Sequence, residues 1–300
     1  MSSHSRLPRI LCLHGSGSNA EIFKCQTRLI RHQLRGSFEF VFVDGPFLSD
    51  PGPGILPTFA EDGPFFQWAA KHSGQDETRA VQHVLGNVAQ QPGSERFVGL
   101  LGFSQGTRVV AGVLRAQQRG ALKLGGRRPV QFRFGVLCMG GGRACFPMEL
   151  VSPTAPAAKV VDREDALIQM PTLHVHGLTD PIYPKSKELV VQFFAPQSAT
   201  VLEVDAGHHL PRRTQDVACV CRQILELYLR SQPPSSGFTS QPQASPETLD
   251  SAMIRRAATP HMRSLSRFST DTIAYSNLRN AFPRQDANAT TSVRSLAELT

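Results

Sequence analysis

The chain has 300 residues, of which 40% are hydrophobic, and is therefore long and apolar enough to bury the core of one large α/β domain or two small ones. Its formal net charge of +8 comes from scattered basic residues without a dense stripe interleaved with aromatics, which argues against a nucleic-acid-binding protein. The six cysteines form no CxxC pair, which predicts reduced thiols and argues against a disulfide framework or a zinc site.

Short apolar runs alternate with amphipathic stretches along the first 230 residues. The apolar runs predict strands over residues 10–13, 38–43, 97–101, 132–138, 172–175 and 200–204. Apolar residues spaced every three or four positions predict helices over residues 20–34, 75–88, 104–118, 185–194 and 214–229. This alternation predicts a mainly parallel sheet with helices on both faces, because parallel neighbours require crossover connections.

The start of the chain and the length of its apolar runs bear on its location. The first predicted strand begins by residue 10, which leaves no room for a signal peptide. No apolar run reaches the roughly 18 residues that a membrane-spanning helix needs. We therefore expect a cytoplasmic protein with no membrane span.

The most informative motif follows the strand predicted over residues 97–101. Gly102-Phe103-Ser104-Gln105-Gly106 joins that strand to a predicted helix, which is the setting of a nucleophile elbow. The two glycines allow the sharp turn without a Cβ clash, and the turn exposes the Ser104 hydroxyl at the start of the helix. The sequence therefore predicts Ser104 as a catalytic nucleophile.

A serine hydroxyl needs a neighbouring base, which an acid in turn orients. Asp180 follows one predicted strand and the pair His208 and His209 follows the next, so the chain order is that of α/β-hydrolases. We favour His208 as the base, because Gly207 directly before it allows the loop to bring the imidazole close. We favour Asp180 as the acid over Asp205, which lies at the expected end of a strand.

Two backbone amides are expected to bind the developing oxyanion, because amides at a helix start are fixed in place before the reaction. Gln105 follows the nucleophile and supplies one amide. Ser16, which follows His14-Gly15 after the first strand, supplies the other. The same stretch fails as a nucleotide-binding loop, because it lacks the third glycine at the required spacing and no Walker lysine follows.

Two segments rich in glycine and proline interrupt the alternation, at residues 45–70 and 140–161. Both follow strands, and loops that leave the carboxyl ends of parallel strands surround the ligand crevice. We expect their aromatic side chains to form an apolar substrate pocket, although packing on the core is the plain alternative. The candidate pocket residues are Phe47, Phe65, Phe66, Trp68 and Phe146.

Four histidines raise the question of a metal site. His174 and His176 lie on a predicted strand beside the loop of Asp180, where histidines packed in the core are commoner than ligands. Together with His208 and His209 they match no metal-binding helix pattern. We assign no metal and no cofactor.

The composition changes at Ser231 to serine, threonine, proline, glutamine and arginine with few aliphatic residues. Such a segment buries too little apolar surface to offset the entropy of ordering it. We therefore predict a globular domain over residues 1–230 and a largely disordered tail over residues 231–300.

Four motifs taken together resemble the FSH family of serine hydrolases. They are residues 10–23, Asp44-Gly45-Pro46, Gly102 to Gly106, and Gly207-His208-His209-Leu210-Pro211. The family's middle motif usually reads Asp-Ala-Pro, so Gly45 departs from it. The histidine motif Gly-His-x-x-Pro of the family aligns on His208.

This resemblance implies an α/β-hydrolase fold and esterase or thioesterase activity on an acyl substrate, without a cofactor. Fungal members that are similar in length and motif order act in polyketide pathways, where they release the acyl product from a carrier domain of the synthase. An acidic carrier domain suits the positive charge of this chain. The alternative is a non-catalytic ligand-binding or scaffold protein on the same fold.

Overall fold

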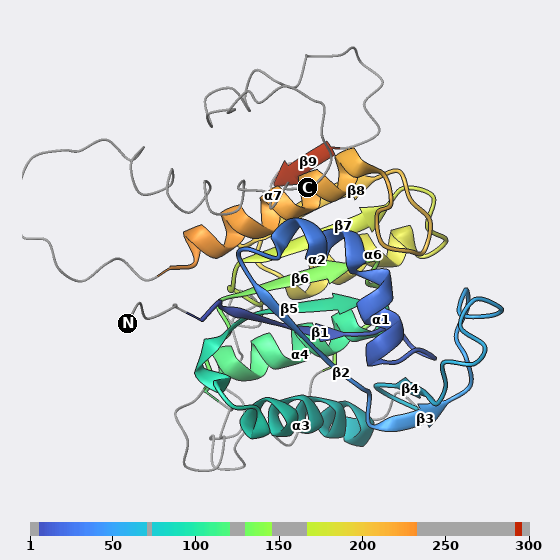
Figure 1. The fold of residues 1–300 in the computed structure, drawn as a ribbon. Coiled ribbons are helices and arrows are strands. Elements are labelled where there is room, and N and C mark those ends of the chain that lie inside the picture. The colour runs from blue at the N-terminus through green and yellow to red at the C-terminus, as the bar shows by residue number, and fades with distance from the viewer. Residues whose placement is uncertain (1–5, 71–73, 121–129, 146–166, 233–291, 296–300) are drawn as a thin grey trace, which may run out of the picture.

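The computed structural model describes residues 6–70, 74–120, 130–145, 167–232 and 292–295 (Figure 1). Within these residues, one sheet has the strand order β2-β1-β5-β6-β7-β8-β9. Its strands are β1 (Arg9–Leu13), β2 (Glu39–Val43), β5 (Phe97–Phe103), β6 (Phe134–Cys138), β7 (Thr172–Gly177), β8 (Ala199–Val204) and β9 (Ser292–Ser295). All neighbouring pairs are parallel except β8 and β9. The six strands predicted from apolar runs are all present.

Helices cover both faces of the sheet, as the alternation predicts (Figure 1). Their bounds are α1 (Ala20–Gln26), α2 (Arg28–Leu34), α3 (Gly74–Gln90), α4 (Gln105–Gln118), α6 (Tyr183–Phe193) and α7 (Thr214–Arg230). The single helix predicted over residues 20–34 is two helices. They meet at Thr27, whose hydroxyl donates a hydrogen bond to the carbonyl oxygen of Phe23 at 2.8 Å.

Each face of the sheet has its own apolar core, because successive residues of a strand point to opposite sides. In β1, Leu11 and Leu13 belong to the core shared with α3, α4 and α6. Ile10 and Cys12 belong to the core shared with α1, α2 and α7. A strand buried on both faces reads as a continuous apolar run, which is why periodicity located these strands.

The glycine- and proline-rich segment at residues 45–70 contains a small hairpin that the sequence does not predict. It pairs β3 (Phe47–Ser49) with β4 (Phe65–Gln67) in antiparallel register. Figure 1 shows this hairpin apart from the main sheet, beyond the carboxyl end of β2. A Cβ at Gly45 would lie 2.5 Å from the carbonyl oxygen of Gln67. Glycine at this position therefore allows the start of the segment to touch its end.

Four residues of the segment predicted to be a disordered tail form a strand. β9 pairs antiparallel with β8, with Val293 opposite Leu202. The rest of the predicted tail after residue 232 lies outside the described residues.

A short 3₁₀ helix, η1 (Ser94–Arg96), precedes β5. In the described part of the chain, no helix combines the length and apolarity that crossing a membrane requires.

Candidate active site

Ser104 occupies the turn between β5 and α4 with a strained backbone. Its φ of 50° and ψ of −118° put a non-glycine residue in the left-handed region, a strain that persists where the surrounding structure holds it. A Cβ at Gly102 would lie 2.7 Å from the carbonyl carbon of Gly106, and a Cβ at Gly106 would overlap the carbonyl oxygen of Leu13. Both glycines are therefore needed for the turn to close against β1.

Three side chains that are distant in sequence form one hydrogen-bonded chain. The Nε2 atom of His208 lies 2.9 Å from the Oγ atom of Ser104, and its Nδ1 atom lies 2.8 Å from Oδ2 of Asp180. The other carboxylate oxygen of Asp180 accepts a hydrogen bond from the backbone N–H of Ile182 at 2.9 Å. The Asp180 side chain is 1% exposed and that of His208 is 31% exposed, so the acid is enclosed while the imidazole is open to a substrate.

The loops that carry Asp180 and His208 are joined through their backbones. The N–H of Thr179 donates to the carbonyl oxygen of Ala206 at 3.1 Å, and the N–H of Leu178 donates to that of Val204 at 2.9 Å. A Cβ at Gly177 would lie 2.8 Å from the carbonyl oxygen of Gly207. Sequence reasoning missed Gly177, although a glycine at the end of a buried strand was an available signal.

The two rival side chains have other partners. Asp205 forms an ion pair with Arg213 at 2.5 Å. The Nδ1 atom of His209 lies 2.9 Å from the carbonyl oxygen of Leu210. The structure thus brings Asp180 and His208 together with Ser104. Asp205 and His209 instead contact residues near them in sequence.

Ser16 and Gln105 lie on the two segments that meet beside Ser104. A Cβ at Gly15 would lie 3.4 Å from the Cβ of Ser104, which shows how closely the loop after β1 approaches the elbow. Gln105 is the first residue of α4, where backbone N–H groups have no partner inside the helix. Within the described residues, neither the Ser16 N–H nor the Gln105 N–H donates a hydrogen bond. Both amides are therefore free to bind an anionic oxygen.

The predicted pocket residues divide into three groups. Phe47, on β3, and Phe65 and Phe66, on β4, are half-buried, and the β4 backbone bonds to the loop after β1, where Phe66 N–H donates to Ser18 O at 2.7 Å. Trp68 is 0% exposed and packs in the core shared with α3 and α4, the plain alternative for these aromatic residues. Phe146 lies outside the described residues.

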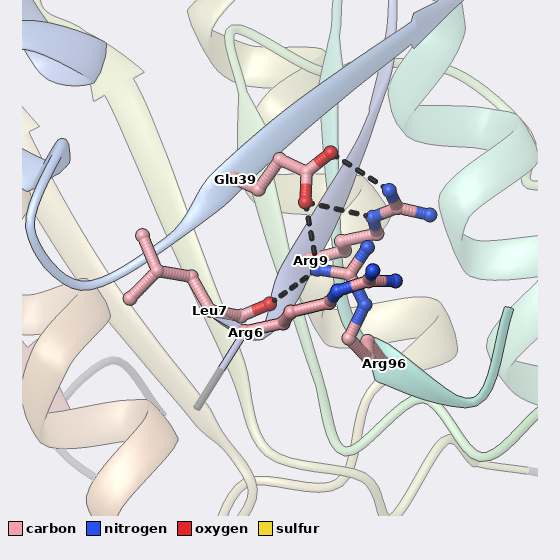
Figure 2. Close-up of a pocket in the computed structure, with 5 residues that line it drawn as sticks. All are labelled: Arg6, Leu7, Arg9, Glu39 and Arg96. Atoms are coloured by element: carbon pink, nitrogen blue, oxygen red, sulfur yellow. Dashed lines mark hydrogen bonds and ion pairs between the residues drawn. The ribbon is translucent and has the colours of Figure 1, made fainter. Parts of the chain in front are cut away.

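A different pocket, of about 450 Å³, lies at the opposite end of the sheet, where β1 and β2 begin. Figure 2 shows the side chains that line it, Arg6, Leu7, Arg9, Glu39 and Arg96. Arg9 and Arg96 each form an ion pair with Glu39 at 2.8 Å. The hydrogen bond from Arg9 is the main cause that lowers the pKa of Glu39. This cluster joins the start of β1, the start of β2 and the end of η1, at the end of the sheet opposite to Ser104.

Two buried histidines have pKa values lowered to about 4, mainly because burial penalises the charged imidazolium: His14, after β1, and His176, on β7. The Nε2 atom of His14 accepts a hydrogen bond from Gly45 N–H at 2.9 Å. The Nδ1 atom of His176 has no partner within the described residues. Both rings are therefore neutral in the folded protein at neutral pH.

From the lowered pKa values of His14 and His176 we expect the free energy of unfolding to fall in acid. An unfolded histidine takes up its proton near pH 6.5, whereas the folded His14 and His176 do so only near pH 4. The contribution of each histidine to the free energy of unfolding is thus fully present above pH 6.5 and is lost as the pH falls toward 4. At about pH 5 the loss is about 2 kcal/mol per histidine. Urea unfolding followed by circular dichroism at about pH 7.5 and about pH 5 measures this loss.

Variants test whether buried histidines cause the dependence of stability on pH. His176→Gln is expected to reduce the slope of stability against pH, whereas His32→Gln, which removes an exposed side chain, serves as the control and retains it. Equal unfolding free energies of the unmodified protein at the two pH values would contradict the assignment.

Comparison with known proteins agrees with the geometry. A family model described as serine hydrolase (FSH1) matches residues 1–220. Esterase citA of Monascus ruber is 38% identical over 242 residues, which cover 74% of this chain and 92% of that protein. Esterase mpl1 of Monascus purpureus is 38% identical over 242 residues, which cover 74% of this chain and 77% of that protein.

Solved structures share the fold. Acyl-protein thioesterase 2 of Zea mays matches with a TM-score of 0.50 at 17% identity, over 76% of this chain and 96% of that chain. The parallel sheet with helices on both faces is that of an α/β-hydrolase, as the strand pattern and the resemblance predict. The family match extends over more than two thirds of the sequence and includes Ser104, Asp180 and His208. The chain belongs to the FSH1 family of serine hydrolases.

Proposed function

We propose that the protein hydrolyses a carboxylic ester or thioester through an acyl-enzyme on Ser104. His208 is the general base and acid, Asp180 orients its ring, and the amides of Ser16 and Gln105 bind the oxyanion. The observation that carries this proposal is the hydrogen-bonded chain from Ser104 through His208 to Asp180, with distances of 2.9 and 2.8 Å.

In the first half of the reaction, the Ser104 Oγ atom attacks the acyl carbonyl carbon while its proton passes to Nε2 of His208. The neutral ring can accept this proton because Nδ1 carries the hydrogen that is donated to Asp180, and the carboxylate then stabilises the imidazolium. The carbonyl oxygen becomes negative and accepts hydrogen bonds from the two free amides. The leaving alcohol or thiol takes its proton from Nε2, which leaves an acyl ester on Ser104.

Water completes the reaction by the same route in reverse. His208 removes a proton from the water, whose oxygen attacks the acyl-enzyme carbonyl, and the same amides bind the second oxyanion. Ser104 then leaves with the proton from Nε2. The products are a carboxylic acid and free enzyme.

The substrate that we propose is an apolar acyl chain, held for instance on a carrier domain of a polyketide synthase. Phe47, Phe65 and Phe66 lie on the hairpin next to the loop of Ser16 and are suited to an apolar chain. The net charge of +8 favours an acidic carrier partner. The relatives named esterases support the ester-hydrolysing chemistry.

A fluorophosphonate probe tests the assembled site. The probe phosphonylates an activated serine with loss of fluoride, so we expect one label per chain, on Ser104 by peptide mass spectrometry. Protein unfolded in urea is the control and should take up no label, because the hydroxyl then has no base beside it. Failure of the folded protein to react would favour the non-catalytic scaffold and overturn the proposal.

A further inference from the structure

Trp68 is hydrogen-bonded to both segments that carry the proposed oxyanion amides. Its indole Nε1–H donates to the carbonyl oxygen of His14 at 2.8 Å, two residues before Ser16. Its backbone N–H donates to the side-chain Oε1 of Gln105 at 2.7 Å. Trp68 thus stands between the loop after β1 and the start of α4.

The side chain of Gln105 completes this link with a second hydrogen bond. Its Nε2–H donates to the carbonyl oxygen of Ala69 at 3.2 Å. The side-chain amide of Gln105 therefore pairs with two consecutive backbone groups, the N–H of Trp68 and the carbonyl oxygen of Ala69. Two bonds from one planar amide fix both its distance and its orientation, which one bond does not.

The link is buried at the Trp68 indole and the His14 carbonyl, and half-buried at the Gln105 side chain. Trp68 and His14 are fully buried, and Ala69 is 1% exposed. Water does not reach the buried carbonyl oxygen of His14, so loss of the indole leaves that group without this partner. The imidazole of His14 adds a bond to the start of the same segment, through Gly45 N–H.

On the basis of the proposed function, we propose that the Gln105 side chain and the Trp68 indole are positioning residues for the oxyanion hole. They hold the N–H of Ser16 and the N–H of Gln105 at a fixed separation. The separation matters because loss of one oxyanion donor costs about 10²- to 10³-fold in rate, and a displacement of about 1 Å can cost about 10²-fold.

The same helix offers a matched control. Gln117, near the other end of α4, is half-buried like Gln105 and also pairs with the backbone through both side-chain atoms. Its Nε2–H donates to Phe132 O at 2.7 Å, and its Oε1 accepts from Phe132 N–H at 2.8 Å. Gln117→Met therefore removes an equivalent pair of bonds without touching the oxyanion segments.

The experiment compares Trp68→Phe, Gln105→Met and Gln117→Met in the full chain. We expect kcat/KM for p-nitrophenyl butyrate to fall about 10- to 100-fold in the first two variants and to stay within about twofold in Gln117→Met. Melting temperatures of the two glutamine variants should fall by similar amounts. The double variant Trp68→Phe/Gln105→Met should lose little more than the worse single variant, because either change breaks the same link.

Inhibition by phenylboronic acid separates positioning from general damage. Ser104 Oγ adds to boron while its proton passes to His208, which gives a tetrahedral adduct with an oxygen at the oxyanion position. We expect the inhibition constant to rise in Trp68→Phe and Gln105→Met by the factor by which kcat/KM falls, and to stay unchanged in Gln117→Met.

Two outcomes would overturn the inference. One is that Gln105→Met and Trp68→Phe match Gln117→Met in both kcat/KM and boronate inhibition. The other is that kcat/KM falls while boronate inhibition does not change. Failure of the proposed function is recognised separately, because the unmodified protein would then show no turnover, or its turnover would survive Ser104→Ala.

Discussion

Ser104→Ala is expected to lower kcat/KM for p-nitrophenyl butyrate by about 10⁴-fold or more, because the variant lacks the attacking oxygen. Alanine removes a single oxygen from a half-buried position, so the fold should remain intact. Circular dichroism and the melting temperature check the fold, and initial rates check the chemistry. Measurement with butyryl-pantetheine in parallel shows whether the same serine acts on a thioester.

Ser198→Ala is the matched control for loss of a serine hydroxyl. The hydroxyl of Ser198 donates to the carbonyl oxygens of Ile168 and Ala195, so its removal costs local hydrogen bonds away from the elbow. We expect kcat/KM within about twofold of the unmodified protein. Turnover by purified Ser104→Ala at the unmodified rate would refute the nucleophile assignment.

The paired variants His208→Gln and His209→Gln should differ by about 10³-fold or more in kcat/KM, with nearly all the loss in His208→Gln. The two residues are neighbours with the same chemistry, so each is a control for the other. Only His208 bridges Ser104 and Asp180 in the described structure, whereas His209 bonds to its own loop. Initial rates and the rate of fluorophosphonate labelling measure the difference.

The result that would contradict this assignment is the reverse order, with the larger loss in His209→Gln. Equal and small losses in both variants would show that neither imidazole removes the serine proton. Melting temperatures for the two variants exclude unfolding as the cause of a lost rate.

The sheet could be predicted from the sequence because its strands are buried on both faces. β5 from Phe97 to Phe103 is buried throughout, and such a strand reads as an uninterrupted apolar run. The turn at Ser104 could be predicted because its glycines, its serine and the helix start are contiguous. Asp180 and His208 followed from a topological rule, since loops after parallel strands meet at one edge of the sheet.

Which of His208 and His209 contacts Ser104, and which of Asp180 and Asp205 contacts the histidine, could be seen only in the structure. His208 and His209 share one loop, and their directions depend on backbone torsions that residue identity does not specify. Asp205 also lies close to His208 in sequence, yet its ion pair with Arg213 depends on where α7 begins. Gly207 and the resemblance favoured His208, and the expected place of Asp205 at a strand end favoured Asp180. The contacts show that His208 and Asp180 are the two that meet.

Short and irregular elements escaped prediction for a physical reason. The three-residue strands β3 and β4 are too short to display alternation. The core position of Trp68 could not be separated from a place in the pocket wall, because the sequence reveals an aromatic residue but not the direction in which it points. The division of one predicted helix at Thr27 depends on a hydroxyl that bonds back to Phe23, which apolar spacing does not detect.

The hairpin segment has a consequence for engineering. A designer who wants a different acyl preference would naturally exchange residues 45–67 for those of a relative, since Phe47, Phe65 and Phe66 lie there. Yet the segment is followed by Trp68, whose backbone N–H bonds to Gln105 at the start of α4 and whose indole bonds to His14 in the loop after β1. With the positioning role that we propose for Trp68, a transplanted segment that shifts residue 68 would slow turnover of every substrate alike, and selectivity and rate would have to be optimised together.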